Sequence, residues 1–276
     1  MSLERKNGFI IIPALNEEDS LPIVLNDLIE YSFVKKENVI VVDNNSTDKT
    51  NEIAKSFGVT VLFEKNQGYG NACLKALSYI EEQVQKPDWI AFLDGDRSDF
   101  VSNLSIVLEP ILNEKADFCV GSREVLEKGA LSLPQIFGNK LVTSLIYFTY
   151  RKKFKDLGSM RVLNYKEFKK LSLQNKTWGW NIEMNLRAIQ ENLKILEVPV
   201  SYRKRFAGVS KISNDWKKIL PVGFTILYTF FKIVISRKKN LIMIEYSTII
   251  ISIKKLEMFI RKITSLKKSE DMESEK

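Results

Sequence analysis

Short apolar segments alternate with amphipathic segments along the first half of the chain. The apolar segments are rich in β-branched residues, which favour strands, whereas the segments between them space their apolar residues by three and four, as helices do. This alternation predicts the order βαβαβαβαβ. The strands are expected at 9–12, 39–42, 59–63, 89–93 and 118–120, and the helices at 18–31, 47–57, 70–85 and 100–112.

The predicted strands are apolar at consecutive positions rather than at alternate ones. Such strands are typical of a mostly parallel sheet with helices on both faces, so the predicted fold class is α/β. The second half of the chain is less regular. It shows helical patterns near 138–150 and 179–192, and strand patterns near 160–163 and 195–200.

Beyond Ser213 the chain becomes apolar and basic. Residues 219–235 are almost wholly apolar, Arg237-Lys238-Lys239 follow, and a second apolar run covers 241–253. The predicted organisation is an α/β domain over 1–213, an apolar and basic helical tail over 214–264, and a disordered terminus over 265–276.

The first apolar run of the tail is marginally short for a bilayer, which requires about 20 apolar residues. With the cations between them, both runs fit helices that lie in the membrane interface beside anionic headgroups. A packed helical appendage or a dimer interface would give the same pattern. A hairpin that spans the membrane is the third alternative.

The charge is unevenly distributed. Residues 1–202 carry 25 Lys and Arg against 27 Asp and Glu, whereas residues 203–276 carry 17 against 7. A basic tail on a neutral body indicates an anionic membrane surface or a phosphate-bearing partner, and it argues against a general nucleic-acid binder.

The sequence contains no histidine, and its two cysteines, Cys73 and Cys119, lack the CxxC spacing. These facts exclude His-ligated zinc and catalysis by Ser-His-Asp or Cys-His groups. No apolar signal segment follows the first residues, so we expect a reduced protein on the cytoplasmic side of a membrane, peripheral or anchored by its tail. Its chemistry must use carboxylates, cations or the substrate's own groups.

Polar clusters follow four successive predicted strands, at 13–18, 43–48, 65–71 and 94–99. The carboxyl ends of parallel strands meet at one edge of a sheet, where ligands of such folds bind. Asp94 and Asp96 flank Gly95 after an apolar strand, which suits Mg²⁺ or Mn²⁺ shared with a diphosphate. A solvated Asp-Gly turn is the alternative.

Asp43 follows the second strand and precedes a Ser/Thr/Asp cluster. It could cap the next helix, hydrogen-bond a nucleotide, or do both. Gly68-Tyr69-Gly70 matches neither a P-loop nor GxGxxG, and it predicts a tight turn into a helix that a ligand could approach.

Eight motifs in register over residues 9–211 resemble family 2 glycosyltransferases, in particular the dolichyl-phosphate mannose and polyprenyl-phosphate glucose synthases. They are Ile10-Ile-Ile-Pro13-Ala-Leu-Asn16-Glu17-Glu18, Val41-Val-Asp43-Asn-Asn-Ser-Thr-Asp48, Asn66-Gln-Gly68-Tyr-Gly70-Asn-Ala72, Leu93-Asp94-Gly-Asp96, Gly121-Ser-Arg123, Asp156-Leu-Gly-Ser-Met-Arg161, Trp180-Asn-Ile-Glu183-Met184, and Glu197-Val-Pro-Val-Ser-Tyr202 leading to Arg205-Phe-Ala-Gly208-Val-Ser210-Lys211.

This resemblance implies the GT-A fold, inversion at the sugar, and a donor that is a uridine- or guanosine-diphosphate hexose. It also implies Mg²⁺ or Mn²⁺ at Asp94 and Asp96. Ser98 is the candidate third metal residue, at a position where the family often has a Gln. Phe137 stands before Gly138-Asn139, where the family often has a basic residue of the phosphate clamp. The donor-binding positions implied are Pro13, Asn16, Glu17, Asp43, Gly68 and Asp94.

The same resemblance places the acceptor phosphate at Arg123, Arg205, Ser210 and Lys211. Asp96, these three cations and Glu183 are then the candidate catalytic residues. Glu183 could contact sugar hydroxyls or act as a base, or it could be a solvated carboxylate in the first turn of a helix.

The lack of histidine fits a phosphate acceptor. A phosphate monoester has a second pKa of about 6 and is largely dianionic at neutral pH, so it needs no base. We therefore expect hexose transfer to a polyprenyl phosphate. The alternatives are transfer to a soluble or saccharide hydroxyl with Glu183 or a nearby carboxylate as base, and a catalytically silent nucleotide-binding or interaction module at a membrane.

Overall fold

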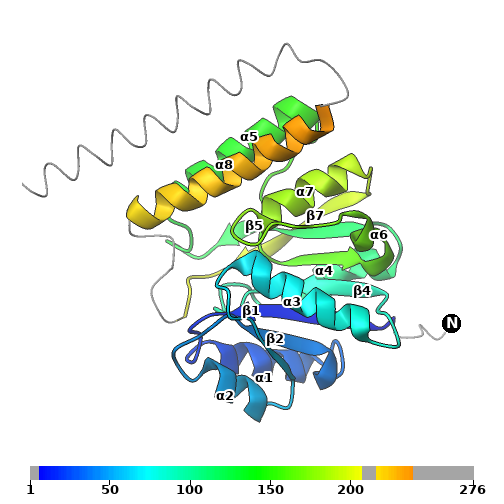
Figure 1. Cartoon of the computed structure of the whole chain (residues 1–276), viewed down its shortest axis with the longest axis vertical. Helices are drawn as coiled ribbons and strands as arrows, with labels where there is room; N and C mark the ends of the chain where they lie inside the picture. The colour runs from blue at the N-terminus through cyan, green and yellow to red at the C-terminus, as the bar shows by residue number, and fades with distance from the viewer. Residues whose placement is uncertain (1–5, 207–215, 239–276) are drawn as a thin grey trace, which may run out of the picture. The chain divides into compact units, whose positions relative to one another are not determined.

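The computed structural model describes residues 6–206 and 216–238. Its strands form one sheet in the order β3-β2-β1-β4-β6-β5-β7 (Figure 1). β6 is antiparallel to β4 and β5, and the other pairings are parallel. The strands are β1 (Gly8–Ala14), β2 (Val39–Asp43), β3 (Thr60–Phe63), β4 (Trp89–Phe92), β5 (Phe118–Leu126), β6 (Arg161–Asn164) and β7 (Ile195–Tyr202).

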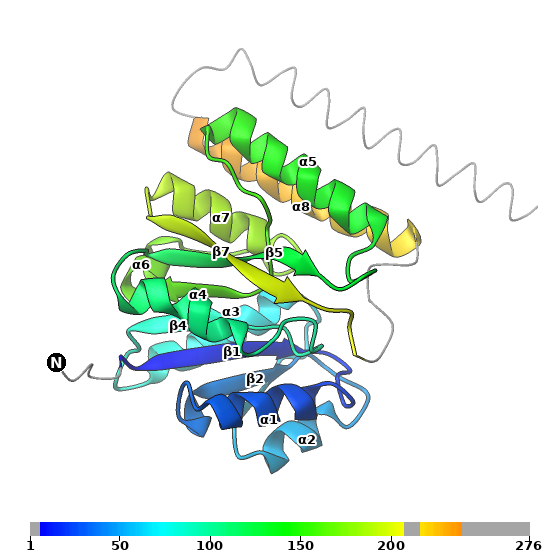
Figure 2. The same ribbon diagram turned by 180° about the vertical axis from the view of Figure 1, so that it is seen from behind.

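Helices cover both faces of the sheet (Figures 1 and 2). The first face packs against α1, α2 and α4, and the second against α3, α6 and α7. The helices are α1 (Leu21–Tyr31), α2 (Thr50–Ser56), α3 (Tyr69–Glu82), α4 (Asn103–Leu112), α5 (Leu133–Tyr150), α6 (Tyr165–Lys170), α7 (Trp180–Gln190) and α8 (Trp216–Lys238), with a 3₁₀ turn, η1, at Lys36–Asn38.

Alternate residues of β1 serve the two layers. Ile10 and Ile12 lie in the core on the α1 side, whereas Phe9 and Ile11 lie in the core on the α3 side. Because both faces are covered, every position of the strand is apolar. The α/β fold with a mostly parallel sheet is therefore confirmed.

The boundaries differ from the prediction where local hydrogen bonds decide them. α5 begins at Leu133 rather than near 138, because Gln135 Oε1 accepts the backbone N–H of Ser132 at 2.8 Å in a capping box. α6 was not predicted. Asn164 caps it by accepting the backbone N–H of Glu167 at 3.2 Å.

The chain divides into two compact units, Met1–Phe230 and Phe231–Lys276, and the site described below belongs to the first. Within the described residues, Ile219–Ser236 is a helical segment long and apolar enough to cross a membrane, with a mean hydropathy of 1.8. The predicted domain boundary at 213, the second apolar run and the terminus 265–276 lie outside the described residues.

Candidate active site

The loops that follow β1 and β2 hold each other in place. Asn16, at φ 53°, accepts the backbone N–H of Thr47 on its Oδ1 at 2.8 Å, and its own N–H donates to Ser46 Oγ at 3.0 Å. The backbone N–H of Glu17 donates to Thr50 Oγ1 at 2.8 Å. The structure thus brings together the predicted donor residues Asn16 and Glu17 and the loop after β2.

Asp43, at the end of β2, is 3% exposed. Its Oδ1 accepts a hydrogen bond from the backbone N–H of Ser46 at 2.9 Å, and its Oδ2 accepts one from Asn51 Nδ2 at 3.0 Å. The carboxylate therefore shapes the turn into α2. Pro13 lies half-buried at the end of β1, in register with Val42.

The glycines at the start of α3, Gly68 at its N-cap and Gly70 in its first turn, are explained by a close backbone contact. A Cβ atom at Gly70 would lie 1.9 Å from Asn175 O, and one at Gly68 would lie 2.3 Å from Lys176 O. The N–H of Gly68 donates to Asn44 Oδ1 at 2.7 Å. This packing explains why both positions are glycine, and the role of Gly68 beside the donor stays a prediction.

Three carboxylates gather in the loop after β4. Asp94 and Asp96 are half-buried, and Asp99 is 2% exposed. Neighbouring atoms enclose the Asp94 carboxylate, and this burial, with the charges of Asp96 and Asp99, raises its pKa. Burial also raises the pKa of Asp99, although Ser159 Oγ donates to its Oδ2 at 2.8 Å.

These three carboxylates suit a divalent cation. The Oδ1 atom of Asp99 is buried without a hydrogen-bond partner, and Mg²⁺ and Mn²⁺ prefer such oxygen ligands. Among the described residues, no group of three or more acidic or cysteine side chains is placed closely enough to hold a metal ion by itself. Ser98 contributes a backbone N–H to Asp96 Oδ1 at 2.9 Å, and its side chain is buried.

Arg205 joins this group from the end of β7. Its Nε lies 3.3 Å from Asp96 Oδ2, and its NH2 group pairs with Glu17 Oε1. The backbone beyond β7 holds the arginine there, because Arg203 N–H donates to Ser98 O at 3.0 Å and Phe206 N–H donates to Asp96 O at 3.4 Å. A cation therefore bridges the predicted donor and metal residues. Ser210 and Lys211 lie outside the described residues.

Arg123, on β5, makes a two-pronged ion pair with Asp156. The Nε–Oδ2 and NH2–Oδ1 distances are 2.6 and 2.7 Å. Asp156 in turn accepts the backbone N–H of Arg123, and its own N–H donates to Glu197 Oε1 at 3.0 Å. The guanidinium also lies 5.1 Å from the centre of the Tyr202 ring. Arg123 is thus held in one orientation.

Glu183 occupies a structural position. It is 5% exposed, and its Oε2 accepts the backbone N–H groups of Gln174 and Asn175 at 3.1 and 2.6 Å. These bonds fix the 174–177 loop, which packs against Gly68 and Gly70. The structure therefore does not support the expectation that Glu183 is a solvated carboxylate, and both backbone bonds compete with a role as base.

Two residues of this region were not predicted as site residues. Asp99 was visible in the sequence as a third carboxylate in the loop after β4, which could have been the signal. Arg161 is fully buried, and it donates to Gly158 O, Asn181 O and Asn185 Oδ1 at 3.0 to 3.1 Å. Its burial lowers its pKa to about 10.

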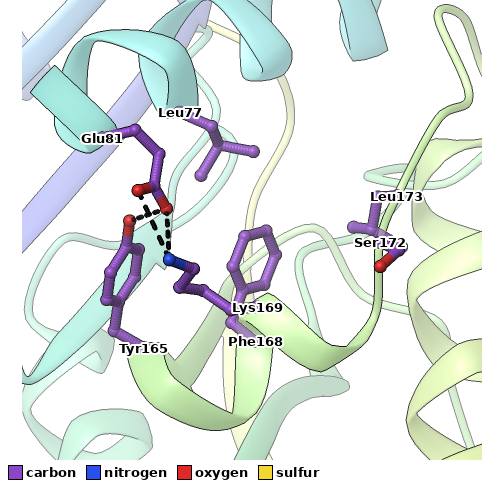
Figure 3. Close-up of a pocket in the computed structure, with 7 residues that line it drawn as sticks. All are labelled: Leu77, Glu81, Tyr165, Phe168, Lys169, Ser172 and Leu173. Atoms are coloured by element: carbon purple, nitrogen blue, oxygen red, sulfur yellow. Dashed lines mark hydrogen bonds and ion pairs between the residues drawn. The ribbon is translucent and has the colours of Figure 1, made fainter.

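A pocket lies between α3 and α6 (Figure 3), lined by Leu77, Glu81, Tyr165, Phe168, Lys169, Ser172 and Leu173. Tyr165 follows Asn164, which pairs with Trp89 at the start of β4, so this pocket is remote from the carboxylates. Tyr165 Oη donates to Glu81 Oε1 at 2.7 Å, and Lys169 Nζ lies 3.1 Å from the same oxygen. These contacts tie α6 to α3.

Comparison with known proteins identifies the family. The model of glycosyl transferase family 2 matches residues 9–168. Glycosyltransferase AglJ of Haloferax volcanii is 28% identical over 72% of this chain, which spans 64% of that protein. The UDP-N-acetylglucosamine–dolichyl-phosphate N-acetylglucosaminyltransferase of Methanococcus voltae is 25% identical over 80% of this chain and 93% of its own length. The polyprenol monophosphomannose synthase of Mycolicibacterium smegmatis is 26% identical, over 75% of this chain and 81% of its own length.

Solved structures share the fold. Glucosyl-3-phosphoglycerate synthase from Mycobacterium tuberculosis, in complex with Mn²⁺, uridine diphosphate and phosphoglyceric acid, superposes with a TM-score of 0.64. The match has 16% sequence identity and covers 83% of this chain and 78% of that one. The resemblance drawn from the eight motifs is confirmed, and the chain belongs to glycosyl transferase family 2, the sugar-transferring enzymes of the GT-A fold.

Proposed function

We propose that this glycosyltransferase moves a hexose from a nucleoside-diphosphate sugar to a polyprenyl phosphate, with inversion at the sugar and with Mg²⁺ or Mn²⁺ bound by Asp94 and Asp96. The main observation in favour of a phosphate acceptor is the burial of Glu183. Its carboxylate is buried against two backbone N–H groups. A hydroxyl acceptor would need a base, whereas a phosphate acceptor does not.

The donor binds at the carboxyl ends of β1, β2 and β4. Asn16 and Glu17 follow β1 and are fixed by hydrogen bonds to the loop after β2, whereas Asp43 ends β2 and is fixed by Ser46 of its own loop. Asp94 and Asp96 lie in the loop after β4 and face the diphosphate of the donor. A divalent cation bound there would stabilise the negative charge of the departing diphosphate. The UDP and Mn²⁺ bound by the mycobacterial relative in fold are in keeping with this donor.

The acceptor phosphate meets arginines. Arg123 is oriented by Asp156, and Arg205 lies between Glu17 and Asp96 at the mouth of the donor site. Guanidinium groups suit phosphate oxygens, and the pairing with carboxylates keeps these two arginines in place before the acceptor arrives. Ser210 and Lys211 follow directly along the chain and complete the acceptor residues in this proposal.

The reaction is an in-line displacement. One oxygen of the acceptor phosphate attacks the anomeric carbon, and the bond from that carbon to the diphosphate oxygen breaks. The electron pair of the broken bond leaves with the nucleoside diphosphate, and no proton has to be removed from the acceptor. The protein then acts by positioning the two substrates and by stabilising charge.

The relatives that act on lipid phosphates support this acceptor. One is named a dolichyl-phosphate N-acetylglucosaminyltransferase and another a polyprenol monophosphomannose synthase. The helix over Ile219–Ser236 is consistent with an enzyme that works at a membrane. A soluble acceptor is the second candidate, because the structural relative is a glucosyl-3-phosphoglycerate synthase, and its acceptor also carries phosphate.

Two substitutions test the metal residues. Asp94→Asn and Asp96→Asn should each lower transfer by roughly a thousandfold. Both should also weaken Mn²⁺ binding to the protein, measured by electron paramagnetic resonance in the presence of nucleoside diphosphate. Glu82→Gln, an exposed residue at the far end of α3, is the control for lost negative charge. Unchanged Mn²⁺ binding in both aspartate variants would remove the metal from the proposal.

A further inference from the structure

The outward face of α5 is apolar. We define this face by six residues of the helix that are between 38% and 81% exposed. At 100° per residue they fall within an arc of about 140°, which Lys140 and Ser144 share. Val142, Thr143 and Ile146 are the buried residues of the helix. The six members are Leu133, Ile136, Phe137, Leu141, Tyr147 and Phe148.

This arrangement inverts the usual pattern of a surface helix. A soluble helix buries its apolar stripe and turns polar side chains to water. α5, the long green helix of Figures 1 and 2, instead carries two phenylalanines that are each 70% exposed. A contiguous exposed apolar face of this kind marks a contact with another molecule or with lipid.

The stretch of sequence that contains α5 carries only positive charges. From Lys128 to Lys155 the chain contains six Lys and Arg residues and no Asp or Glu. Lys140 lies exposed within the face, and Arg151, Lys152 and Lys153 follow the last turn of α5. An apolar stripe with cations within it and after it in the sequence is the composition of helices that lie in the interface of an anionic membrane. Two copies of the face would instead bring like charges together.

α5 is attached to the proposed acceptor side of the site. Asn139 Oδ1 accepts the backbone N–H of Leu157 at 3.0 Å, and the preceding residue, Asp156, is the partner of Arg123. A surface that contacts the outward face therefore lies next to the segment that orients Arg123.

We infer that the outward face of α5 binds the surface of an anionic phospholipid membrane, with its aromatic side chains among the headgroups and acyl ends. This surface belongs to a helix of the unit Met1–Phe230, at residues that precede the apolar tail in the sequence. The inference does not depend on the identity of the acceptor, because membrane contact can be measured without turnover.

A depth measurement tests it in the full chain. Tryptophan is introduced one position at a time by Leu133→Trp and Phe148→Trp, at the two ends of the face, and by Val84→Trp, at a fully exposed loop position after α3. The fluorescence of the introduced tryptophan is obtained by subtracting the spectrum of the parent chain. It is followed as phosphatidylcholine vesicles that contain phosphatidylglycerol and brominated acyl chains are added. We expect the first two variants to shift to the blue and be quenched, and the third to do neither.

A second variant measures the contribution to affinity. Leu133→Ser with Phe148→Ser should weaken binding to the same vesicles by roughly tenfold or more, because two apolar side chains lose their contact. Vesicles without phosphatidylglycerol should bind the parent chain less well. Absence of quenching at both positions of α5 would overturn the inference. So would a parent dimer that the double substitution converts to a monomer with no change in vesicle binding, since the face would then join two copies.

Discussion

The Nε atom of Arg205 lies 3.3 Å from Oδ2 of Asp96. The same guanidinium pairs with Glu17. Arg205 therefore already neutralises part of the negative charge of the carboxylates in the loop after β4. A metal ion that binds Asp96 must compete with this arginine. The ion pair therefore links the proposed metal site to the proposed acceptor site.

We predict that Arg205→Ala tightens Mn²⁺ binding to the substrate-free protein by roughly threefold or more, because a positive charge next to a metal ligand is removed. Transfer to the phosphate acceptor should fall at the same time. Electron paramagnetic resonance of free Mn²⁺ measures the affinity. Arg203→Ala is the matched control, since that arginine stacks on Phe100 at 4.1 Å. Weaker Mn²⁺ binding in the Arg205 variant would contradict the competition.

Glu183→Gln separates the two classes of acceptor. The amide oxygen can still accept the N–H groups of Gln174 and Asn175, so we expect a turnover within about threefold of the parent enzyme. The free energy of unfolding should fall by about 1–2 kcal/mol, because hydrogen bonds to a charged acceptor are the stronger ones. Steady-state kinetics and urea denaturation measure both. A hundredfold loss of turnover in a folded variant would instead identify Glu183 as a base.

The ion pair of Arg123 and Asp156 makes stability depend on pH. Burial alone would raise the pKa of Asp156, but the hydrogen bonds and charge of Arg123 lower it below its ordinary value of 3.8. The ionised form is therefore stabilised on folding. This contribution is complete above about pH 4 and is lost as the pH falls through the lowered pKa.

We predict that Asp156→Asn lowers the free energy of unfolding by about 3 kcal/mol at pH 7, since both side chains are mostly buried. The difference from the parent chain should shrink as the pH is lowered below 4. Urea denaturation between pH 7 and pH 3 follows the difference. A gap that stays constant over this range would show that the pair does not depend on the charge of Asp156.

We predict that substitution of glycine by alanine has opposite effects on stability at two positions. Gly70→Ala places a Cβ atom 1.9 Å from Asn175 O, so the free energy of unfolding should fall by about 1–3 kcal/mol and the thermal midpoint with it. Gly138 lies inside α5 with open space at its Cβ position, and Gly138→Ala should stabilise the protein by about 0.5–1 kcal/mol. Thermal unfolding of the two variants checks both signs. A neutral Gly70→Ala would refute the close packing of the two loops.

The sequence was sufficient to predict the strands and the mostly parallel character of the sheet, but not the strand order or the antiparallel β6. Consecutive apolar residues in 39–42 and 89–93 reported burial on both faces, and the polar clusters after them marked the carboxyl edge. Contacts between distant segments could not be predicted in this way. Glu183 shows the reason, because its partners at 174 and 175 lie in a loop whose path depends on tertiary packing.

The same limit applies to the ion pairs of the site. The spacing of Arg205 and Asp96 along the chain says nothing of their 3.3 Å contact, which arises because the backbone beyond β7 runs beside the loop after β4. The outward face of α5 has the same periodicity as a buried stripe, so only the observed exposure of Phe137 and Phe148 distinguishes the two.

The proposed acceptor is tested most directly by mass spectrometry of the lipid extract. Purified protein with Mn²⁺ or Mg²⁺ is incubated with uridine- and guanosine-diphosphate hexoses and with either a short polyprenyl phosphate or the corresponding polyprenol, and free nucleotide is measured in the aqueous phase. We predict a polyprenyl phosphohexose and an equal amount of nucleoside diphosphate with the phosphate, and no product with the alcohol. Release of nucleoside diphosphate with a glycosylated alcohol or soluble sugar, and no phosphohexose, would contradict the account.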